Sequence, residues 1–159
     1  MTCPPGCERA LTAGELALVQ AVFRDQVDPG KVRILRRRWF PLQPRAITMA
    51  PCGHIHFHPQ SPMYRDDFAR APLPLQGFFI HEMTHVWQTQ RRGRYYLLLR
   101  RHPFCRYGFR VQPGWKLADY GLEQQAEIVR HAFLIRHGGH VASESEQAAI
   151  CELVDAALG

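Results

Sequence analysis

The chain has 159 residues, of which 46% are hydrophobic and 21% are charged, and its formal net charge is +6 at pH 7. These values are typical of globular proteins and exclude disordered and fibrous chains. The length is near the common size of one domain, so we expect a single domain over residues 1–159 that buries a core without metal or disulfide staples.

The sequence shows neither a membrane span nor a Sec-type signal. No apolar run approaches the roughly 20 residues that a membrane-spanning helix needs. The first residues, MTCPPGCERAL, lack the basic start and the apolar stretch of a secretory signal. We therefore expect a monomer that is cytoplasmic as synthesised, that has no membrane partner, and whose export, where it occurs, follows a non-Sec route.

The five cysteines form an odd and widely scattered set. An odd number argues against a framework in which every cysteine is paired, so we expect reduced thiols. Cys3 and Cys7 leave two alternatives open, which are a clip at the N-terminus and a share in a second metal site.

The positive charge suggests a nucleic-acid partner, because lysine and arginine neutralise phosphates. Arginine gathers in three runs, at residues 36–38, 91–94 and 100–101. These runs are short, and no recognised binding module surrounds them. We therefore expect a solvated surface and no nucleic-acid partner.

The N-terminal half predicts one helix followed by extended segments. A Thr-x-x-Glu capping box at residues 12–15 and apolar residues at helical intervals predict a helix over residues 13–25. An extended region begins at Val32. Residues 46–50 and 54–58, separated by a Pro-Cys-Gly turn, predict the two strands of a hairpin.

The C-terminal half predicts helices separated by one long connection. Residues 75–90 place apolar side chains on one broad helical side, which buries this helix in the core. Residues 94–118 predict a mostly irregular connection. A helix over residues 119–137 and a last helix that begins at a capping box at residues 143–146 complete the chain. The fold class is therefore expected to be α+β, with several helices against a small sheet that contains the hairpin.

Residues 81–85 read HEMTH, an H-E-x-x-H motif inside the predicted helix 75–90. Side chains four residues apart lie one turn above each other, so the imidazoles of His81 and His85 can meet one zinc ion. Glu82 is turned by about 100° around the helix axis from His81, where it can reach a metal-held water but cannot comfortably join the ligands. This spacing predicts a zinc site with Glu82 as the catalytic base.

Glu123 and Glu127 are candidates for the third metal ligand, which the H-E-x-x-H motif does not supply. They stand four residues apart on one side of the predicted helix 119–137. A carboxylate completes a three-ligand catalytic zinc site and leaves a position open for water. The alternative is a pair of solvated carboxylates on an exposed helix face.

The two motifs together resemble the glutamate zincins, or gluzincins, whose second helix carries E-x-x-x-D or a close variant. The resemblance implies that Glu123 is the third zinc ligand and that Glu127 accepts the remaining N–H of a metal-bound histidine. Glutamate stands at residue 127 where that family has aspartate, and the longer side chain leaves open which of the two acids touches zinc.

A wider resemblance covers roughly residues 11–137. The order LTAGELALVQAVF, VDPGKVRIL, a hairpin and FFIHEMTHVWQTQ is similar to the metallopeptidase-like core domain that is associated with bacterial extracellular contractile injection systems. Small proteins of this type are related to the spike proteins of type VI secretion. The resemblance implies a compact zincin-like fold, a bound Zn2+ and a role as an effector or in maturation.

These residues predict a zinc-dependent endopeptidase that acts on peptide or protein substrates, with Glu82 moving a proton from water to the leaving amine. Spacing selects no residue that stabilises the oxyanion, and the candidates are Tyr107, Tyr120, His102 and His131. The second hypothesis is a zinc-stabilised binding or scaffold component of a secretion apparatus with an unused cleft. The third hypothesis is nucleic-acid binding through the arginine runs.

His54, His56 and His58 alternate with apolar residues, so their side chains face one way on the predicted strand 54–58. Successive side chains on one face are nearly 7 Å apart, which favours a polar outer face over a second metal site. By analogy with zincins, the edge of this strand is expected to pair with an extended peptide.

Overall fold

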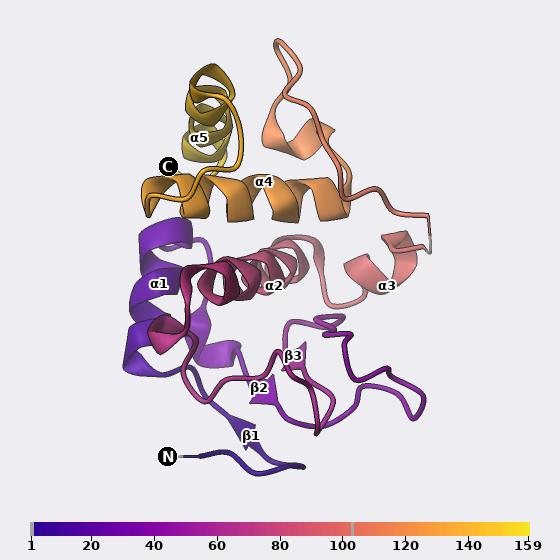
Figure 1. Cartoon of the computed structure of the whole chain (residues 1–159). Coiled ribbons are helices and arrows are strands. Elements are labelled where there is room, and N and C mark those ends of the chain that lie inside the picture. The colour runs from indigo at the N-terminus through magenta and orange to yellow at the C-terminus, as the bar shows by residue number, and fades with distance from the viewer. Residues whose placement is uncertain (1, 103) are drawn as a thin grey trace.

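The computed structural model describes residues 2–102 and 104–159, within which helices pack against a small sheet (Figure 1). The predicted α+β class is confirmed. The α-helices are α1 (Ala13–Phe23), α2 (Leu73–Arg92), α3 (Tyr96–Arg100), α4 (Leu122–Arg136) and α5 (Glu144–Leu158). The strands are β1 (Glu8–Arg9), β2 (Ile34–Leu35) and β3 (Ile55–His56). Among the described residues, no helix has both the length and the apolar character that crossing a bilayer requires.

α1 begins at the predicted capping box. The Thr12 hydroxyl accepts the backbone N–H of Glu15 at 3.1 Å, and the Glu15 carboxylate accepts the backbone N–H of Thr12 at 2.9 Å. Glu15 is fully buried, and its charge is paired with Arg9 at 2.7 Å. Its other oxygen accepts the N–H of Phe68 at 2.9 Å, so one buried carboxylate ties α1 to the segment before α2.

The predicted hairpin forms only in part, because the main strand partner of β3 is β2 and not residues 46–50. β3 pairs in parallel with β2, with Ile55 opposite Ile34, and β1 adds antiparallel to the other edge of β2. Residues 46–50 contribute one isolated bridge, between Met49 and His56. The reason is burial, because Ile34 and Ile55 are both fully enclosed and a β2–β3 pair hides them together. The side chain of Gln43 donates to the carbonyl oxygen of Ile47 at 2.8 Å and so supplies a partner that a longer ladder would provide.

α2 and α4 form the centre of the molecule and lie alongside each other (Figure 1). α2 is buried along most of its length from Phe79 to Thr89, as its broad apolar side predicts. Gly77 allows the close approach, because a Cβ atom there would lie 2.8 Å from Cδ2 of Leu134 on α4. This contact lies one turn before the H-E-x-x-H motif on α2 and near the C-terminal end of α4.

The connection between α2 and α4 contains more structure than its composition predicts. The short helix α3 lies within it and buries Leu97, and a 3-10 turn at Leu117–Asp119 leads into α4. Pro103 of the predicted connection lies outside the described residues. The last helix begins as predicted, with the carboxylate of Glu146 accepting the N–H of Ser143 at 3.3 Å.

Cys3 and Cys7 form a disulfide, which corrects the expectation of reduced thiols at these two positions. Their Cα atoms are 5.8 Å apart, within the usual reach of the bond. A tight turn between them, with Gly6 at φ 92°, returns the chain on itself. An odd number of cysteines excludes complete pairing but does not exclude one local pair. Cys52, Cys105 and Cys151 are free.

Candidate metal centre

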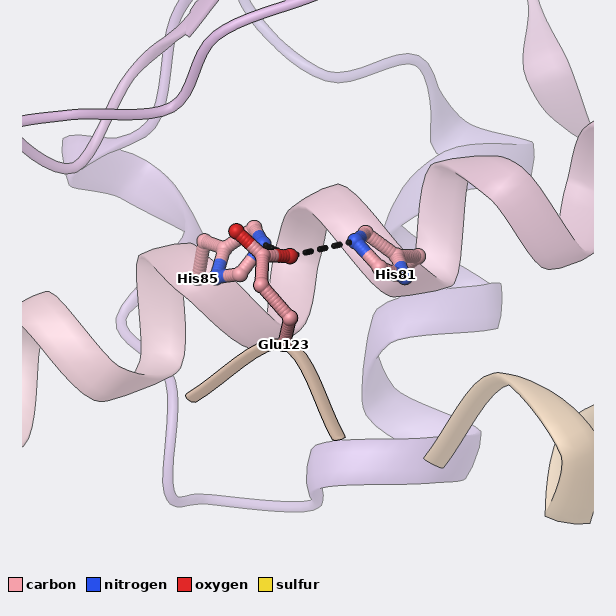
Figure 2. A group of neighbouring side chains, drawn as sticks. All are labelled: His81, His85 and Glu123. Carbon is pink, nitrogen blue, oxygen red and sulfur yellow. Dashed lines mark hydrogen bonds and ion pairs between the residues drawn. The ribbon is translucent and has the colours of Figure 1, made fainter. Parts of the chain in front are cut away.

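The structure brings His81, His85 and Glu123 together in the core. His81 and His85 project from α2, and Glu123 enters from the first turn of α4 with its carboxylate between the two imidazoles (Figure 2). One ligand atom from each residue lies within 4.8 Å of the others, and all three side chains are buried. Among the residues that the structure describes, this is the one such group of potential metal ligands.

The two separations that join Glu123 to the imidazoles are close to those between ligands of a tetrahedral zinc ion. The Oε2 atom of Glu123 is 3.1 Å from Nε2 of His85 and 3.3 Å from Nε2 of His81. Ligands at the usual zinc distances in a tetrahedral site are separated from one another by roughly 3.4 Å. The donor set, two imidazole nitrogens and one carboxylate oxygen, is also one that catalytic zinc sites use. These residues therefore fit zinc in both chemistry and spacing.

Glu127 lies on the other side of His81. Its Oε1 atom is 2.7 Å from Nδ1 of His81, although the contact is a close approach of charges rather than an aligned hydrogen bond. The same carboxylate is 3.3 Å from Arg130 and 3.6 Å from His131. A carboxylate at Nδ1 keeps a proton on that nitrogen and leaves Nε2 facing Glu123.

Gln88 supports His85 in a comparable way. Its Oε1 atom is 2.9 Å from Nδ1 of His85, on the side opposite to Glu123. The Gln88 amide nitrogen donates to the carbonyl oxygen of Leu122 and to Oε1 of Gln125, each at 3.0 Å. The Gln125 amide in turn donates to the carbonyl oxygen of Tyr120 at 2.7 Å. This chain of amides orients the His85 ring and connects α2 to the start of α4.

Arg101 holds the second oxygen of Glu123. Its Nε atom is 2.9 Å from Oε1, while Oε2 faces the imidazoles. The ion pair is fully buried on the carboxylate side and about one-third exposed on the arginine side. Oε2 of Glu123 is therefore available to a metal, while the charge at Oε1 is neutralised by Arg101.

The charges of the cluster shift the pKa values of its members. Burial alone lowers the pKa of His81, but the carboxylates of Glu123 and Glu127 outweigh it and raise the pKa to about 9. Burial alone raises the pKa of Glu123, but the neighbouring imidazoles and Arg101 hold it far below its usual range. The pKa of Glu127 is also lowered, because His81 and Arg130 outweigh its burial. The site is thus an ionised carboxylate facing an imidazole that retains its proton unless a metal displaces it.

Glu82 lies on α2 beside the first histidine and is 6% exposed. Its negative charge contributes to the raised pKa of both His81 and Arg101. A carboxylate in this position can accept a proton from a water molecule at the centre, which is the chemistry that the motif predicts.

Known proteins share both the sequence and the fold. No protein-family model matches the chain. The type VI secretion system spike protein VgrG2b of Pseudomonas aeruginosa is 41% identical over an alignment of 133 residues that covers 79% of this chain and 13% of that protein. The solved effector domain of Pseudomonas aeruginosa VgrG2b has a TM-score of 0.71 and 35% identity, and the match covers 91% of this chain and 80% of that one. The chain belongs to the VgrG2b effector-domain family.

Four side chains were predicted as candidates to stabilise an oxyanion. In this member of the VgrG2b effector-domain family they have different surroundings. The Tyr107 ring lies parallel to the His81 ring with centroids 6.3 Å apart, and its hydroxyl is 3.4 Å from Arg101. The Tyr120 hydroxyl accepts the backbone N–H of Gln112 at 2.9 Å. His131 lies 3.6 Å from the Glu127 carboxylate, while Nδ1 of His102 accepts the backbone N–H of Phe104. Of the four, Tyr107 is the one whose ring stacks on a candidate ligand, His81, and its side chain is half exposed.

The three alternating histidines do not form a polar outer face. His56 and His58 are buried, which corrects that expectation. The loop before β3 folds over them, with Trp39 edge-on to His56 at 5.2 Å and Arg38 at 2.9 Å from the His58 ring. Burial lowers the pKa of His56 to about 4, so its ring is neutral in the core.

Sequence reasoning about this VgrG2b-type domain missed three residues that support the ligands. Gln88 carried a usable signal, because residues three apart on a helix are neighbours and Gln88 follows His85 by three. Gln125 and Arg101 carried none, since their contacts depend on how α3 and α4 pack. Arg101 also corrects the interpretation of its arginine run as solvated surface.

Proposed function

We propose that the chain is an effector of a bacterial secretion apparatus and that it hydrolyses peptide bonds with a zinc ion. Kinship with the VgrG2b effector domain supports the first half, although the chain spans about one-eighth of VgrG2b itself. The single observation that supports the second half is the buried group of two imidazoles and one carboxylate next to Glu82.

His81, His85 and Glu123 would hold the zinc ion. When bound, zinc lowers the pKa of water and polarises a carbonyl oxygen. The chain's own residues orient these ligands, because Gln88 fixes the His85 ring and Glu127 lies at the far nitrogen of His81. Such supporting contacts fix the tautomer and the direction of each imidazole.

Glu82 is the base in this proposal. It takes a proton from the attacking water and passes it to the nitrogen of the leaving amine, so its own charge is restored at the end of the reaction. Tyr107 and Arg101 lie 3.4 Å apart beside the ligands and offer an O–H and an N–H to the negative charge that develops on the substrate oxygen.

Three variants test the assignment. Wild-type protein is expected to bind one zinc per chain and to cleave members of a peptide library. Glu82→Gln is expected to keep zinc but to lose cleavage, since glutamine preserves the shape and removes the base. His85→Ala is expected to lose zinc, with Leu99→Ala, at an exposed site on α3, as a matched control. Cleavage by Glu82→Gln at the wild-type rate would refute the mechanism.

A non-catalytic effector is the second candidate. The name of the relative describes an effector domain, and the buried carboxylate of Glu123 is already neutralised by Arg101 and two imidazoles. A network of this kind can serve structure alone. Zinc-loaded protein that cleaves no peptide, together with unchanged effector function in Glu82→Gln, would favour this candidate over the peptidase.

A further inference from the structure

A half-open cavity of about 610 Å³ lies between the C-terminal turns of α2, residues 111–118 and α5. Residues 111–118 and α5 lie on the same side of α4 in Figure 1. The volume falls within the range of sites for small molecules. His81, His85 and Glu123 do not line it, so the cavity is separate from the metal centre.

The walls of the cavity are apolar and the rim is basic. Trp87 from α2 and Trp115 from the connection contribute indole rings, and Ala149, Ala156 and Ala157 form a wall of small side chains on α5. Trp115 is 47% exposed, whereas Trp87 is 9% exposed. An apolar body of moderate size matches these surfaces.

The charged groups that line the cavity are unequal in sign. Three of them are cations and one is a carboxylate, namely Arg91, Arg92, Lys116 and Glu152. Arg91 is held over Trp87 at 5.4 Å. Arg92 and Lys116 are exposed and available to a ligand. The excess of positive charge favours an anion over a neutral or cationic ligand.

The cavity is connected to the metal centre through two of its lining residues. Gln88 and Gln125 both line it, and these are the amides that hold His85. Gln88 is in contact with Nδ1 of His85 at 2.9 Å. A ligand in contact with Gln88 and Gln125 is expected to alter the contact that orients His85, and contacts of this kind affect metal affinity.

We propose that this cavity is a second binding site, for a small organic anion with an apolar body, and that its occupant is linked to the metal centre through Gln88 and His85. The apolar body packs against the exposed indole of Trp115 and the alanine wall. The anionic group lies at Arg92 and Lys116. The binding half is independent of catalysis, and the linkage half rests on the proposed zinc site.

The binding half is tested with two fluorescent probes, anilinonaphthalene sulfonate and its uncharged counterpart phenylnaphthylamine. The sulfonate is expected to bind with one site per chain and at least about tenfold more tightly than the uncharged probe. Arg92→Gln with Lys116→Gln is expected to weaken the sulfonate about tenfold, because each exposed charge contributes modestly. Arg45→Gln with Arg70→Gln removes the same charge from exposed sites away from the cavity and is expected to leave binding within about twofold.

A filling variant locates the site. Ala156→Trp places an indole from α5 into the cavity and is expected to abolish probe binding, while circular dichroism shows that the domain stays folded. Equal binding of both probes, or binding that survives both the filling and the charge variants, would overturn the proposal. A dimer that excludes the sulfonate would assign the cavity to a second copy of the chain and would also overturn it.

The linkage half has its own measurement. Coupling is reciprocal, so zinc is expected to change the dissociation constant of the sulfonate by the factor by which the sulfonate changes that of zinc, about fivefold or more. Equal probe affinity in zinc-loaded and chelator-treated protein refutes the linkage. A protein that binds the probe at the cavity but never binds zinc refutes the proposed function and leaves the binding site standing.

Discussion

Zinc binding is expected to depend steeply on pH because of one imidazole. The carboxylates of Glu123 and Glu127 raise the pKa of His81 to about 9 in the metal-free protein. A histidine ligates zinc only through a deprotonated nitrogen. Below pH 9, zinc must therefore displace a proton from His81, and binding becomes stronger as the pH rises.

The size of this effect follows from the pKa. One proton displaced per zinc changes the apparent dissociation constant about tenfold for each pH unit below the pKa. The pKa of His81 is about 9. Zinc is therefore expected to bind about 100-fold more weakly at pH 7 than on the plateau above pH 9. Glu127→Gln removes one of the carboxylates that raise this pKa, so the plateau is expected to begin at a lower pH.

The assay is competition for zinc against a fluorescent chelator that is calibrated at each pH. Circular dichroism over the same range shows that the protein remains folded. The matched control is Glu146→Gln, whose carboxylate caps α5 and lies outside the ligand cluster, and its profile is expected to follow wild type. A dissociation constant that stays constant within about twofold between about pH 7 and pH 8.5 would refute the reasoning.

The raised pKa of His81 also makes the stability of the metal-free protein depend on pH. The pKa of His81 is raised from 6.5 to about 9 on folding, so protonation of His81 stabilises the metal-free fold fully below pH 6.5. That contribution is lost as the pH rises through about 9. The melting temperature of the metal-free protein is therefore expected to fall between pH 6.5 and 9, and the zinc-loaded protein is expected to lack this fall. A metal-free melting temperature that rises over this interval would contradict the assignment.

Three substitutions extend these expectations. Gln88→Leu removes the acceptor at Nδ1 of His85 and is expected to weaken zinc binding by about 10- to 100-fold, as measured by chelator competition. Arg101→Gln leaves Oε1 of Glu123 without its cation, so the metal-free protein is expected to lose about 2 kcal/mol in urea unfolding, while zinc binds more tightly. Gly77→Leu is expected to cost about 2 kcal/mol or more by forcing α2 from α4, and more than Gly77→Ala, whose single Cβ requires only a shift of the Leu134 side chain and gains helix propensity. Equal unfolding free energies for the two Gly77 variants would contradict the close packing.

Some of the support for the centre lies beyond local sequence patterns. Arg101 sits in a short arginine run that has the composition of solvated surface, yet α3 carries it against a buried carboxylate 22 positions later in the chain. The pairing of β3 with β2 is similar, because the alternation of residues 54–58 indicates a strand but does not identify its neighbour. Both outcomes depend on which apolar surfaces are buried together.

The sequence by itself determined the features that depend on near neighbours. The capping boxes of α1 and α5, the α+β class, and the placing of His81 and His85 on one side of α2 follow from spacing along a helix. Only the tertiary structure decided which carboxylate oxygen faces the imidazoles, that Arg101 takes the other, and that a cavity lies behind His85. The physical reason is that helical spacing is a property of a few consecutive residues, whereas these contacts require α2, α3, α4 and α5 to pack around one core.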